Sequence, residues 1–186
     1  MKNKKNQDQL AAYSKFLSLV LRHSPQSIGL KLDGAGWAPT QELLACLQKS
    51  RYPMGLELLQ QVVAADSKQR YAFSEDGLRI RANQGHSIAV ELSLVPQQPP
   101  AQLFHGTATR FLPAILEQGL TRQQRHHVHL SASQEVAATV GRRYGQLALL
   151  AVDAQAMHAD GHGFYCSDNG VWLSDAVPAR YLKVQA

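Results

Sequence analysis

The sequence is poor in cysteine and has no long apolar run. Its two cysteines, Cys46 and Cys166, lie far apart and match no metal-binding or redox spacing. Such usage is typical of a reducing compartment and predicts a cytoplasmic protein. No apolar run approaches the roughly 18 residues that a membrane span requires. The basic start, MKNKKNQDQL, has no apolar segment of the kind found in signal peptides, so we expect no membrane partner.

Several catalytic signatures are also missing. The sequence contains no nucleophilic triad motif, no glycine-rich dinucleotide fingerprint, no phosphate-binding P-loop and no acidic metal-binding loop. Carboxylates are sparse after residue 102, where they comprise Glu117, Glu135, Asp153, Asp160, Asp168 and Asp175. A site in this half of the chain must therefore work through arginine and histidine.

Arginine is unusually favoured over lysine in the second half. The 186 residues carry a formal net charge of +5, which favours polyanionic partners. Beyond residue 95 there is one lysine, Lys183, against six arginines: 110, 122, 125, 142, 143 and 180. The forked guanidinium suits phosphate or carboxylate recognition, although a compositional bias of the source genome would give the same count.

The first half reads as helices followed by a hairpin. Apolar spacing predicts helices over 10–22, from an N-cap at Thr40 to near residue 50, and over 55–65. Alternation over 70–82 predicts a hairpin turning at Asp76 and Gly77, with Leu78 among its inward-facing residues, and a further strand over 87–95. Three helices and a hairpin indicate a winged-helix-like lobe over residues 1–95.

A proline-rich connector at 96–102, PQQPPAQ, is the expected linker to a second lobe at 103–186. There we expect a strand entering a glycine turn at 102–107, a helix ending at Gly119, a strand around 126–133 and a buried strand over 146–155. Ser131 and Gln134 have the spacing of a capping box for the following helix. The segment 169–184 supplies two further short strands. The fold class is therefore α+β.

Four clusters could carry chemistry. The first helix ends on Arg22 and His23 just before Pro25; cations there offset the helix dipole or are presented to a ligand. Arg81 is followed within six residues by a dense set of polar or close-approach residues: Gln84, Gly85, His86 and Ser87. Arg79, in contrast, reads as a solvated side chain. The glycine of FHGT at 104–107 marks an ordinary turn or the close approach of a backbone or flat ligand.

The densest cluster is RQQRHHVHLSAS at 122–133. In a strand, His127 and His129 point to one face and Val128 and Leu130 to the core, with Arg125 near the histidines. Two histidines without a cysteine or carboxylate partner fall short of the three or four ligands of a zinc site.

Taken in order, KFLSLVLRHSPQSIGLKLDGAGWAPTQELL, KQRYAFSEDGLRIRANQGHS, FHGT, RHHVHLS and NGVWL resemble the NAD-dependent RNA 2′-phosphotransferase family known from tRNA splicing. The resemblance extends from about residue 14 to 182. It implies a winged-helix lobe, an ADP-ribosyltransferase-like lobe and a site between them. The expected partners are NAD as co-substrate and an RNA with an internal 2′-phosphate. We expect no metal and no obligate protein partner.

The resemblance also assigns residues. It implies a catalytic tetrad of Arg22, His23, Arg70 and Arg125. His105, Gly106 and Thr107 match the NAD site of the family. The match is looser for three further dinucleotide contacts: Ser131, Arg142 or Arg143, and Asn169. The set expected to bind RNA or phosphate comprises Arg81, Gln84, His86 and Ser87.

The implied reaction has two steps. The 2′-phosphate is mostly a dianion at neutral pH because its second pKa is about 6. It attacks C1″ of the nicotinamide ribose and expels nicotinamide. The ribose O2″ then attacks phosphorus, giving RNA 2′-OH and ADP-ribose 1″,2″-cyclic phosphate. Both steps need a fixed positive cradle, which guanidinium groups provide. His23 either holds phosphate as a cation or protonates the departing RNA oxygen.

Two alternatives stay open. An ADP-ribosyltransferase that stops after the first step is disfavoured by the matched tetrad and by the lack of an obvious ribose-binding glutamate near NGVWL. A winged-helix regulator with an idle second domain would bind duplex DNA with a steep salt dependence and would not use NAD.

Overall fold

The computed structural model describes residues 2–185, and the side chains of residues 7–185. The chain forms two compact units, Met1–Ser93 and Leu94–Ala186. The proline-rich segment belongs to the second unit: the N–H of Gln97 donates to the carbonyl of Phe164 at 2.8 Å, and Pro96 forms a bridge with Tyr165. Its last residue, Gln102, already begins a strand.

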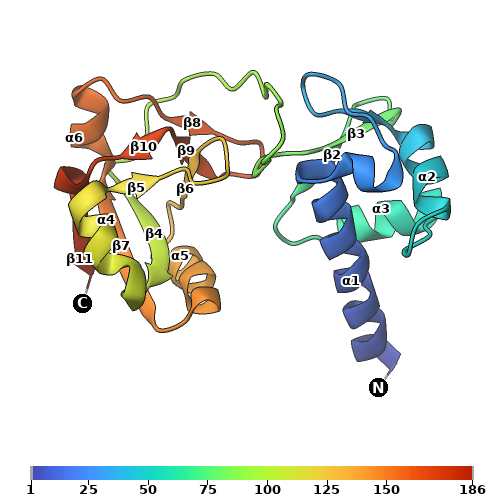
Figure 1. Ribbon diagram of the computed structural model, residues 1–186, viewed down its shortest axis with the longest axis horizontal. Coiled ribbons are helices and arrows are strands. Elements are labelled where there is room, and N and C mark those ends of the chain that lie inside the picture. The colour runs from blue at the N-terminus through green and yellow to red at the C-terminus, as the bar shows by residue number, and fades with distance from the viewer. Residues whose placement is uncertain (1, 186) are drawn as a thin grey trace. The chain divides into compact units, whose positions relative to one another are not determined.

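The first unit combines three helices with a small antiparallel sheet (Figure 1). Its elements are α1 (Lys2–Arg22), η1 (Pro25–Ile28), β1 (Ala38–Pro39), α2 (Thr40–Gln48), α3 (Leu56–Ala64), β2 (Tyr71–Phe73) and β3 (Arg79–Ala82). The sheet has the order β1-β3-β2. The three predicted helices and the hairpin are confirmed.

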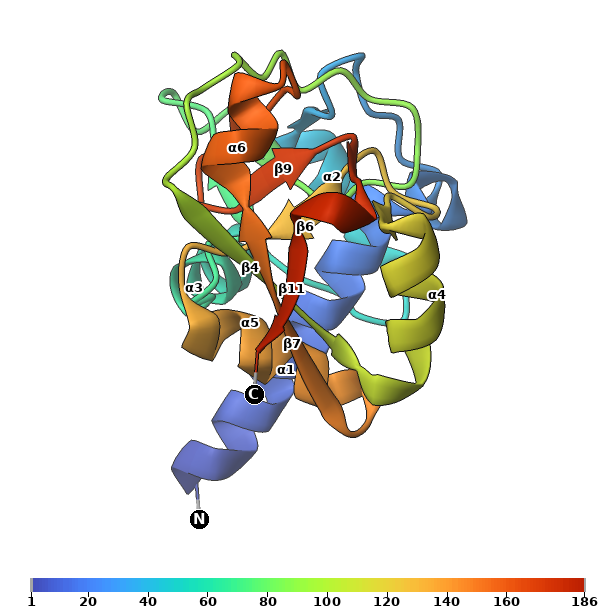
Figure 2. The same cartoon turned by 90° about the vertical axis from the view of Figure 1, so that its left-hand side faces the viewer.

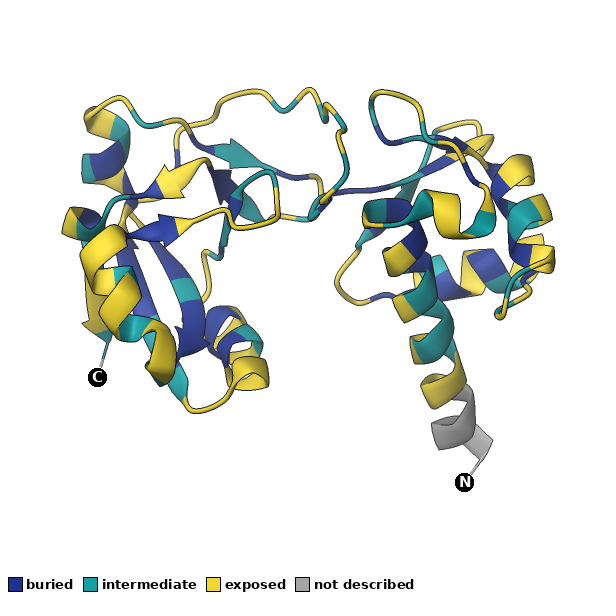
Figure 3. Cartoon of the chain, in the orientation of Figure 1, coloured by how far each residue is buried: buried dark blue, intermediate teal, exposed yellow. Residues whose placement is uncertain are grey.

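The helices hold together through one apolar face each. Leu17, Val20 and Leu21 of α1 are fully buried, and they belong to one core with Leu59 of α3 and Ile80 of β3. Burying a leucine-sized side chain contributes about 1.5–3 kcal/mol, so this spacing of apolar residues suffices to dock α1. Figure 3 shows the buried residues along the C-terminal part of α1.

Two local predictions in this unit are wrong. Thr40 is the first residue of α2 rather than its N-cap, and its hydroxyl donates to the carbonyl of Gly77 at 3.0 Å. Leu78 is 63% exposed because it lies in the turn before β3 instead of in a strand. There the Asp76 carboxylate accepts the N–H of Leu78 at 2.9 Å, and Gly77 takes a φ of 71°.

The predicted strand over 87–95 is also wrong. The segment alternates between exposed and partly buried residues, as a strand would, but forms no ladder. The segment is fixed by single backbone hydrogen bonds instead. The N–H of Ser87 donates to Arg22 O at 3.0 Å, and the N–H of Glu91 to Gly34 O at 2.7 Å.

The second unit is richer in strands. Its elements are β4 (Gln102–Ala108), η2 (Thr109–Phe111), α4 (Leu112–Gln118), β5 (Leu120–Thr121), β6 (Val128–Leu130), α5 (Gln134–Gly141), η3 (Arg142–Tyr144), β7 (Leu147–Asp153), α6 (Ala154–Ala159), β8 (Tyr165–Cys166), β9 (Trp172–Ser174), β10 (Ala176–Val177), η4 (Ala179–Tyr181) and β11 (Leu182–Gln185). Figure 2 shows β7 between β4 and β11. A second sheet has the order β6-β9-β8, and β10 pairs with β5.

The glycine of FHGT is not in a turn. Gly106 lies inside β4, where a Cβ atom would stand 1.8 Å from the carbonyl oxygen of Ala137 in α5. Gly141, at the end of α5, also leaves no room for a side chain, since a Cβ would stand 2.8 Å from Gly106 C. The two glycines therefore let α5 lie directly on β4. Of the two alternatives for this motif, a turn or the close approach of another backbone or ligand, the structure shows the close approach of a backbone.

The cap of α5 also differs from the prediction. Ser133 is the N-cap and its hydroxyl accepts the N–H of Val136 at 3.3 Å. The hydroxyl of Ser131 accepts the N–H of Ser133 at 3.0 Å, which shapes the turn before the helix. Gln134 is the first helical residue, two positions before the third helical residue, where the capping-box partner stands.

The remaining predictions for this unit are largely confirmed. α4 ends before Gly119, which has a φ of 81°, and β7 is a mostly buried strand. The segment 169–184 forms three short strands rather than two. Segregated helices and small antiparallel sheets confirm an α+β fold. Among the described residues, no helix is long and apolar enough to cross a membrane.

Candidate active site

The end of α1 presents the Arg-His pair to two neighbouring segments. The guanidinium of Arg22 lies 3.5 Å from the carbonyl oxygen of Arg70, in the loop before β2. Nδ1 of His23 and the hydroxyl of Ser87 are 2.9 Å apart, and the backbone of Ser87 donates to Arg22 O. Residues predicted for one site from distant parts of the sequence are thus neighbours within the first unit.

Arg70 is held by a buried carboxylate. Asp66 accepts the backbone N–H of Arg70 at 2.7 Å and also contacts its guanidinium Nη1. The side chain of Arg70 is 28% exposed and that of Asp66 only 3%. Asp66 was not predicted; the available signal was a carboxylate four residues before an arginine at a strand start.

Arg81 stacks on an aromatic ring. Its guanidinium carbon lies 4.6 Å from the ring centre of Trp37, and that of Arg79 lies 5.2 Å from the same ring. Such cation–π contacts explain the ordering of both arginines on the outer face of β3. Arg79 is exposed, as predicted, but its contact with Trp37 was missed.

The residues after Arg81 enter a partly buried loop. His86 is 1% exposed, and its Nε2 stands 3.4 Å from where a Cβ on Gly36 would be. Gln84 is partly buried and Ser87 exposed. Ser87 is linked to the Arg22 and His23 cluster through its side chain and its backbone.

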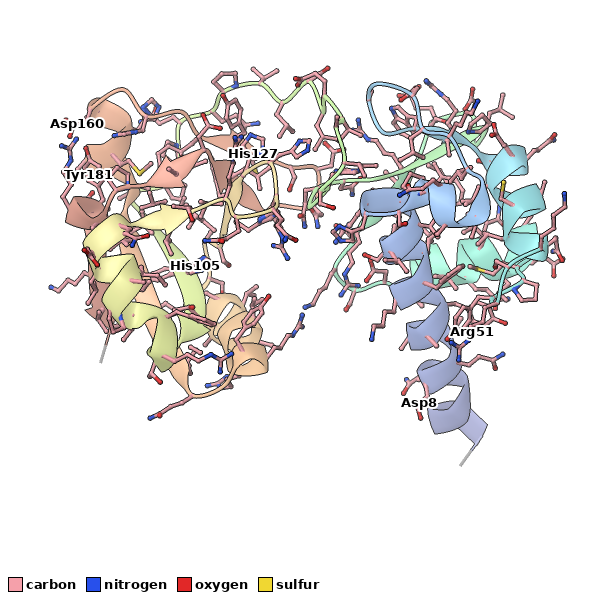
Figure 4. All side chains as sticks on the ribbon, viewed as in Figure 1. Asp8, Arg51, His105, His127, Asp160 and Tyr181 are labelled. Carbon is pink, nitrogen blue, oxygen red and sulfur yellow. The ribbon has the colours of Figure 1, made fainter. Side chains whose placement is uncertain are left out.

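In the second unit, His105 is the central polar residue of β4 (Figure 4). Its Nδ1 lies 3.0 Å from the carbonyl oxygen of His129. Burial lowers the pKa of His105, the hydrogen bond to His129 opposes this, and the charge of Arg125 lowers it further. A carbonyl only accepts, so Nδ1 carries the proton and, in the neutral ring, Nε2 is an acceptor.

The backbone of Gly106 faces the edge of β4 away from β7. Phe104 exchanges backbone hydrogen bonds with Ser131 at 2.8 and 2.9 Å, whereas Thr109 donates toward the β7 side, to Gln146 O, at 2.9 Å. Backbone groups alternate between the two edges of a strand, so Gly106 shares the Phe104 edge. Thr107 is buried, on the same strand face as His105.

Arg125 lies near His129. The Arg125 Nη1 and His129 Nδ1 are 3.3 Å apart, and because a guanidinium only donates, Nδ1 of His129 accepts. Val128 and Leu130 are buried, as predicted. His127 (Figure 4) instead pairs with Asp175 at 3.8 Å and lies against the Tyr165 ring.

The loosely assigned residues are spread over the second unit. Ser131 bridges to Phe104 beside His105, so it lies at the same strand edge as Gly106. Arg142 and Arg143 are exposed in η3. Asn169 lies in the β8–β9 turn, where its Oδ1 is 2.8 Å from the Ser167 hydroxyl.

The described part of the chain brings together no group of three or more histidine, cysteine or acidic side chains that could hold a metal ion. The groups that the two clusters offer to a ligand are guanidinium donors, imidazoles and the backbone of Gly106 at the edge of β4 away from β7. Such groups stabilise phosphoryl oxygens and bind the polar edges of a planar ligand.

Comparison with known proteins agrees with this chemistry. The family "RNA 2′-phosphotransferase, Tpt1 / KptA family" matches residues 8–176. A protein of Acaryochloris marina named "Probable RNA 2′-phosphotransferase" is 54% identical over 174 residues, which cover 94% of this chain and 96% of that protein.

Proteins with the same name in Agrobacterium fabrum and Rhodopirellula baltica are 56% and 53% identical over 175 residues. These matches span 94% of this chain, and 94% and 95% of the two relatives respectively. The chain therefore belongs to the RNA 2′-phosphotransferase (Tpt1 / KptA) family of transferases.

Proposed function

We propose that this protein removes an internal 2′-phosphate from RNA by transferring it to the ADP-ribose part of NAD. The products are RNA 2′-OH, nicotinamide and ADP-ribose 1″,2″-cyclic phosphate, formed in two steps. The observation that carries the proposal is the pairing of Arg22 with the Arg70 loop beside His23, in a chain that belongs to this family.

The first unit would act as a winged-helix-like lobe that binds the RNA phosphate. The planar guanidinium forks of Arg22 and Arg70 match phosphoryl oxygens in shape and charge. The 2′-phosphate is mostly a dianion at neutral pH because its second pKa is about 6. It therefore needs an electrostatic cradle more than a strong base. Arg125 of the second unit would complete the tetrad on the same substrate.

His23 would contribute the only titrating group of the tetrad. Its Nδ1 is hydrogen-bonded to the hydroxyl of Ser87. This contact orients the ring and leaves Nε2 as the nitrogen that would hold or release the proton. The ring can bind phosphate as a cation, and can deliver a proton to the RNA 2′-oxygen as it leaves. The Ser87 hydroxyl would fix the ring for either role.

The second unit would act as an ADP-ribosyltransferase-like lobe, and its residues fit a dinucleotide. Nε2 of His105 is an acceptor suited to a ribose hydroxyl, and the outward N–H and C=O of Gly106 match the two polar atoms of a carboxamide. Thr107 and Ser131 lie on the same strand or beside it, while Asn169, with Arg142 or Arg143, would bind the remaining polar groups. When bound, NAD supplies the electrophilic ribose carbon and the nicotinamide leaving group.

The test is an oligonucleotide with a single labelled internal 2′-phosphate, incubated with the protein with and without NAD. The proposal predicts that the label leaves the RNA only when NAD is present. A label that stays on the RNA as an ADP-ribosylated phosphate would indicate a transferase that stops after the first step. Unchanged RNA in both reactions would refute the proposal.

A further inference from the structure

We propose that Asp66 is a positioning residue for catalysis: its buried carboxylate closes the loop 66–70 and fixes the direction of the Arg70 guanidinium. The inference rests on the proposed function, because it takes Arg70 as a group that contacts the substrate phosphate. Asp66 itself would touch neither RNA nor NAD.

Asp66 contacts the backbone of its own loop and the guanidinium of Arg70. One carboxylate oxygen, Oδ2, accepts the N–H of Arg70 at 2.7 Å. The other, Oδ1, accepts the N–H of Lys68 at 3.4 Å and contacts Nη1 of Arg70. The Asp66 side chain is 3% exposed, whereas that of Arg70 is 28% exposed. Asp66 therefore holds the Arg70 guanidinium from the buried side, while the exposed part of the side chain remains available to contact a ligand.

The backbone of the loop is constrained by a second residue. Gln69 has a φ of 44°, in the left-handed region that residues other than glycine seldom adopt. Its N–H donates to Asp66 O at 2.8 Å, and its carbonyl accepts Nδ2 of Asn83 at 2.7 Å. The N–H of Asn83 donates to Arg70 O at 2.9 Å. Because Arg22 also reaches this Arg70 carbonyl, the loop fixes the place of both arginines.

A comparison within the same unit separates loop closure from arginine positioning. Asp33 closes the loop 33–37 by accepting the N–H groups of Ala35 and Trp37, each at 2.9 Å. These contacts go to backbone N–H groups and suffice to shape a loop. Asp66 makes the same kind of backbone contacts and adds the contact to a guanidinium. Closing the loop does not require that additional contact.

The negative charge of Asp66 lowers the attraction of this region for phosphate, and this cost also supports a positioning role. A carboxylate beside Arg70 weakens the local positive potential and hence the attraction for a phosphate dianion. An arginine that served only as a positive charge would bind the dianion better without it. The carboxylate is favourable where the direction of the guanidinium fork matters, because displacement of a reacting or stabilising group by about 1 Å can cost roughly 100-fold in rate.

The experiment compares Asp66→Asn with the matched variant Asp33→Asn in the full-length protein. Asparagine keeps the shape and can still accept the N–H of Arg70, but it loses the charge that holds the guanidinium. We expect kcat for loss of the 2′-phosphate to fall about 10- to 100-fold in Asp66→Asn, with an unchanged KM for NAD. Asp33→Asn should keep the kcat of the wild type.

A readout of side-chain order accompanies the kinetics. Relaxation of the Arg70 Nε–H group in NMR spectra should show an ordered guanidinium in the wild type and a mobile one in Asp66→Asn. Should Asp66→Asn lose cooperative unfolding, Asp66→Glu takes its place. The glutamate keeps the charge but shifts the fork, so kcat should again fall while the KM for NAD holds.

The outcomes distinguish this inference from the proposed function. An active wild type with Asp66→Asn at equal kcat, or with Arg70 equally ordered in both proteins, would overturn the role of Asp66. A kcat loss of the same size in Asp33→Asn would overturn it too, because any loop-closing aspartate would then behave alike. A wild type that leaves the 2′-phosphate on RNA would instead refute the proposed function.

Discussion

The guanidinium of Arg22 and the carbonyl oxygen of Arg70 are 3.5 Å apart, which ties the end of α1 to the start of β2. A cation at the end of a helix also offsets the helix dipole, by about 0.3–1 kcal/mol. The dipole effect alone does not require the Arg22 guanidinium to contact the loop that carries Arg70. The contact places the Arg22 guanidinium beside the Arg70 loop, as the proposed phosphate-binding site requires.

Replacing either of two arginines should abolish turnover. Arg70→Ala and Arg125→Ala each remove a fixed donor to phosphoryl oxygens, which commonly costs about 10²–10³ in rate. Both side chains reach the surface, so the folded state should persist, as checked by circular dichroism. The measurement is the rate of 2′-phosphate loss with saturating NAD.

Arg79→Ala is the matched control for these variants. Arg79 is exposed and contacts the Trp37 ring at 5.2 Å, so its loss should change the rate by less than about 3-fold. Wild-type activity in Arg70→Ala or Arg125→Ala would mean that the phosphate-binding arginines are misassigned.

His105 should make stability depend on pH. Burial lowers its pKa in the folded protein below the ordinary value of 6.5, so the unfolded chain binds the proton first as the pH falls. The stability contributed by neutral His105 is therefore full above about pH 6.5 and is lost toward the lower pKa of the folded state. In urea unfolding, the midpoint should fall less between pH 7 and pH 5 for His105→Gln than for the wild type. Parallel curves would contradict a buried, neutral His105.

Gly106→Ala should destabilise the second unit. The new methyl group would stand 1.8 Å from Ala137 O and 3.0 Å from Gly141 N, both backbone atoms. Separating α5 from β4 to relieve this contact should cost about 3 kcal/mol or more in the free energy of unfolding. Gly34→Ala has open space around its Cβ and should unfold like the wild type. Equal stability of the two variants would disprove the direct packing of α5 on β4.

Two neighbouring serines should separate stability from binding. Ser133→Ala removes the N-cap of α5 and should cost about 1 kcal/mol of stability, with an unchanged KM for NAD. Ser131→Ala should raise the KM for NAD instead, because Ser131 lies beside His105 at the proposed dinucleotide edge. Thermal unfolding measures the stability loss, and initial rates measure the KM for NAD. A raised KM in Ser133→Ala together with an unchanged KM in Ser131→Ala would contradict these roles.

Periodic segments were the most predictable part of the fold. The spacing of Leu17, Val20 and Leu21 indicated α1 because one buried stripe suffices to dock a helix. The prediction of a strand over 87–95 was wrong because alternation indicates which residues face inward but does not specify a pairing partner, and this segment forms no ladder. Likewise, the Ser131 and Gln134 spacing fitted a capping box, while the actual turn shifted the cap to Ser133.

The site was only partly predictable for a similar reason. The family resemblance assigned Arg22, His23 and Arg70, whereas the residue types alone also allowed structural roles for them. The groups that fix them were missed. Trp37 contacts Arg81 from a segment distant in the sequence, which a single sequence does not indicate. Asp66 lies only four residues before Arg70, but that spacing alone does not show that the two side chains meet.

The most direct measurement of the central claim is the fate of the phosphorus atom. An RNA with a single ³²P-labelled internal 2′-phosphate is converted by the wild type with NAD, and the small products are separated. We predict that the label appears in ADP-ribose 1″,2″-cyclic phosphate, in an amount equal to the RNA 2′-OH formed. Label recovered as inorganic phosphate, or released at the same rate without NAD, would contradict a transfer to ADP-ribose.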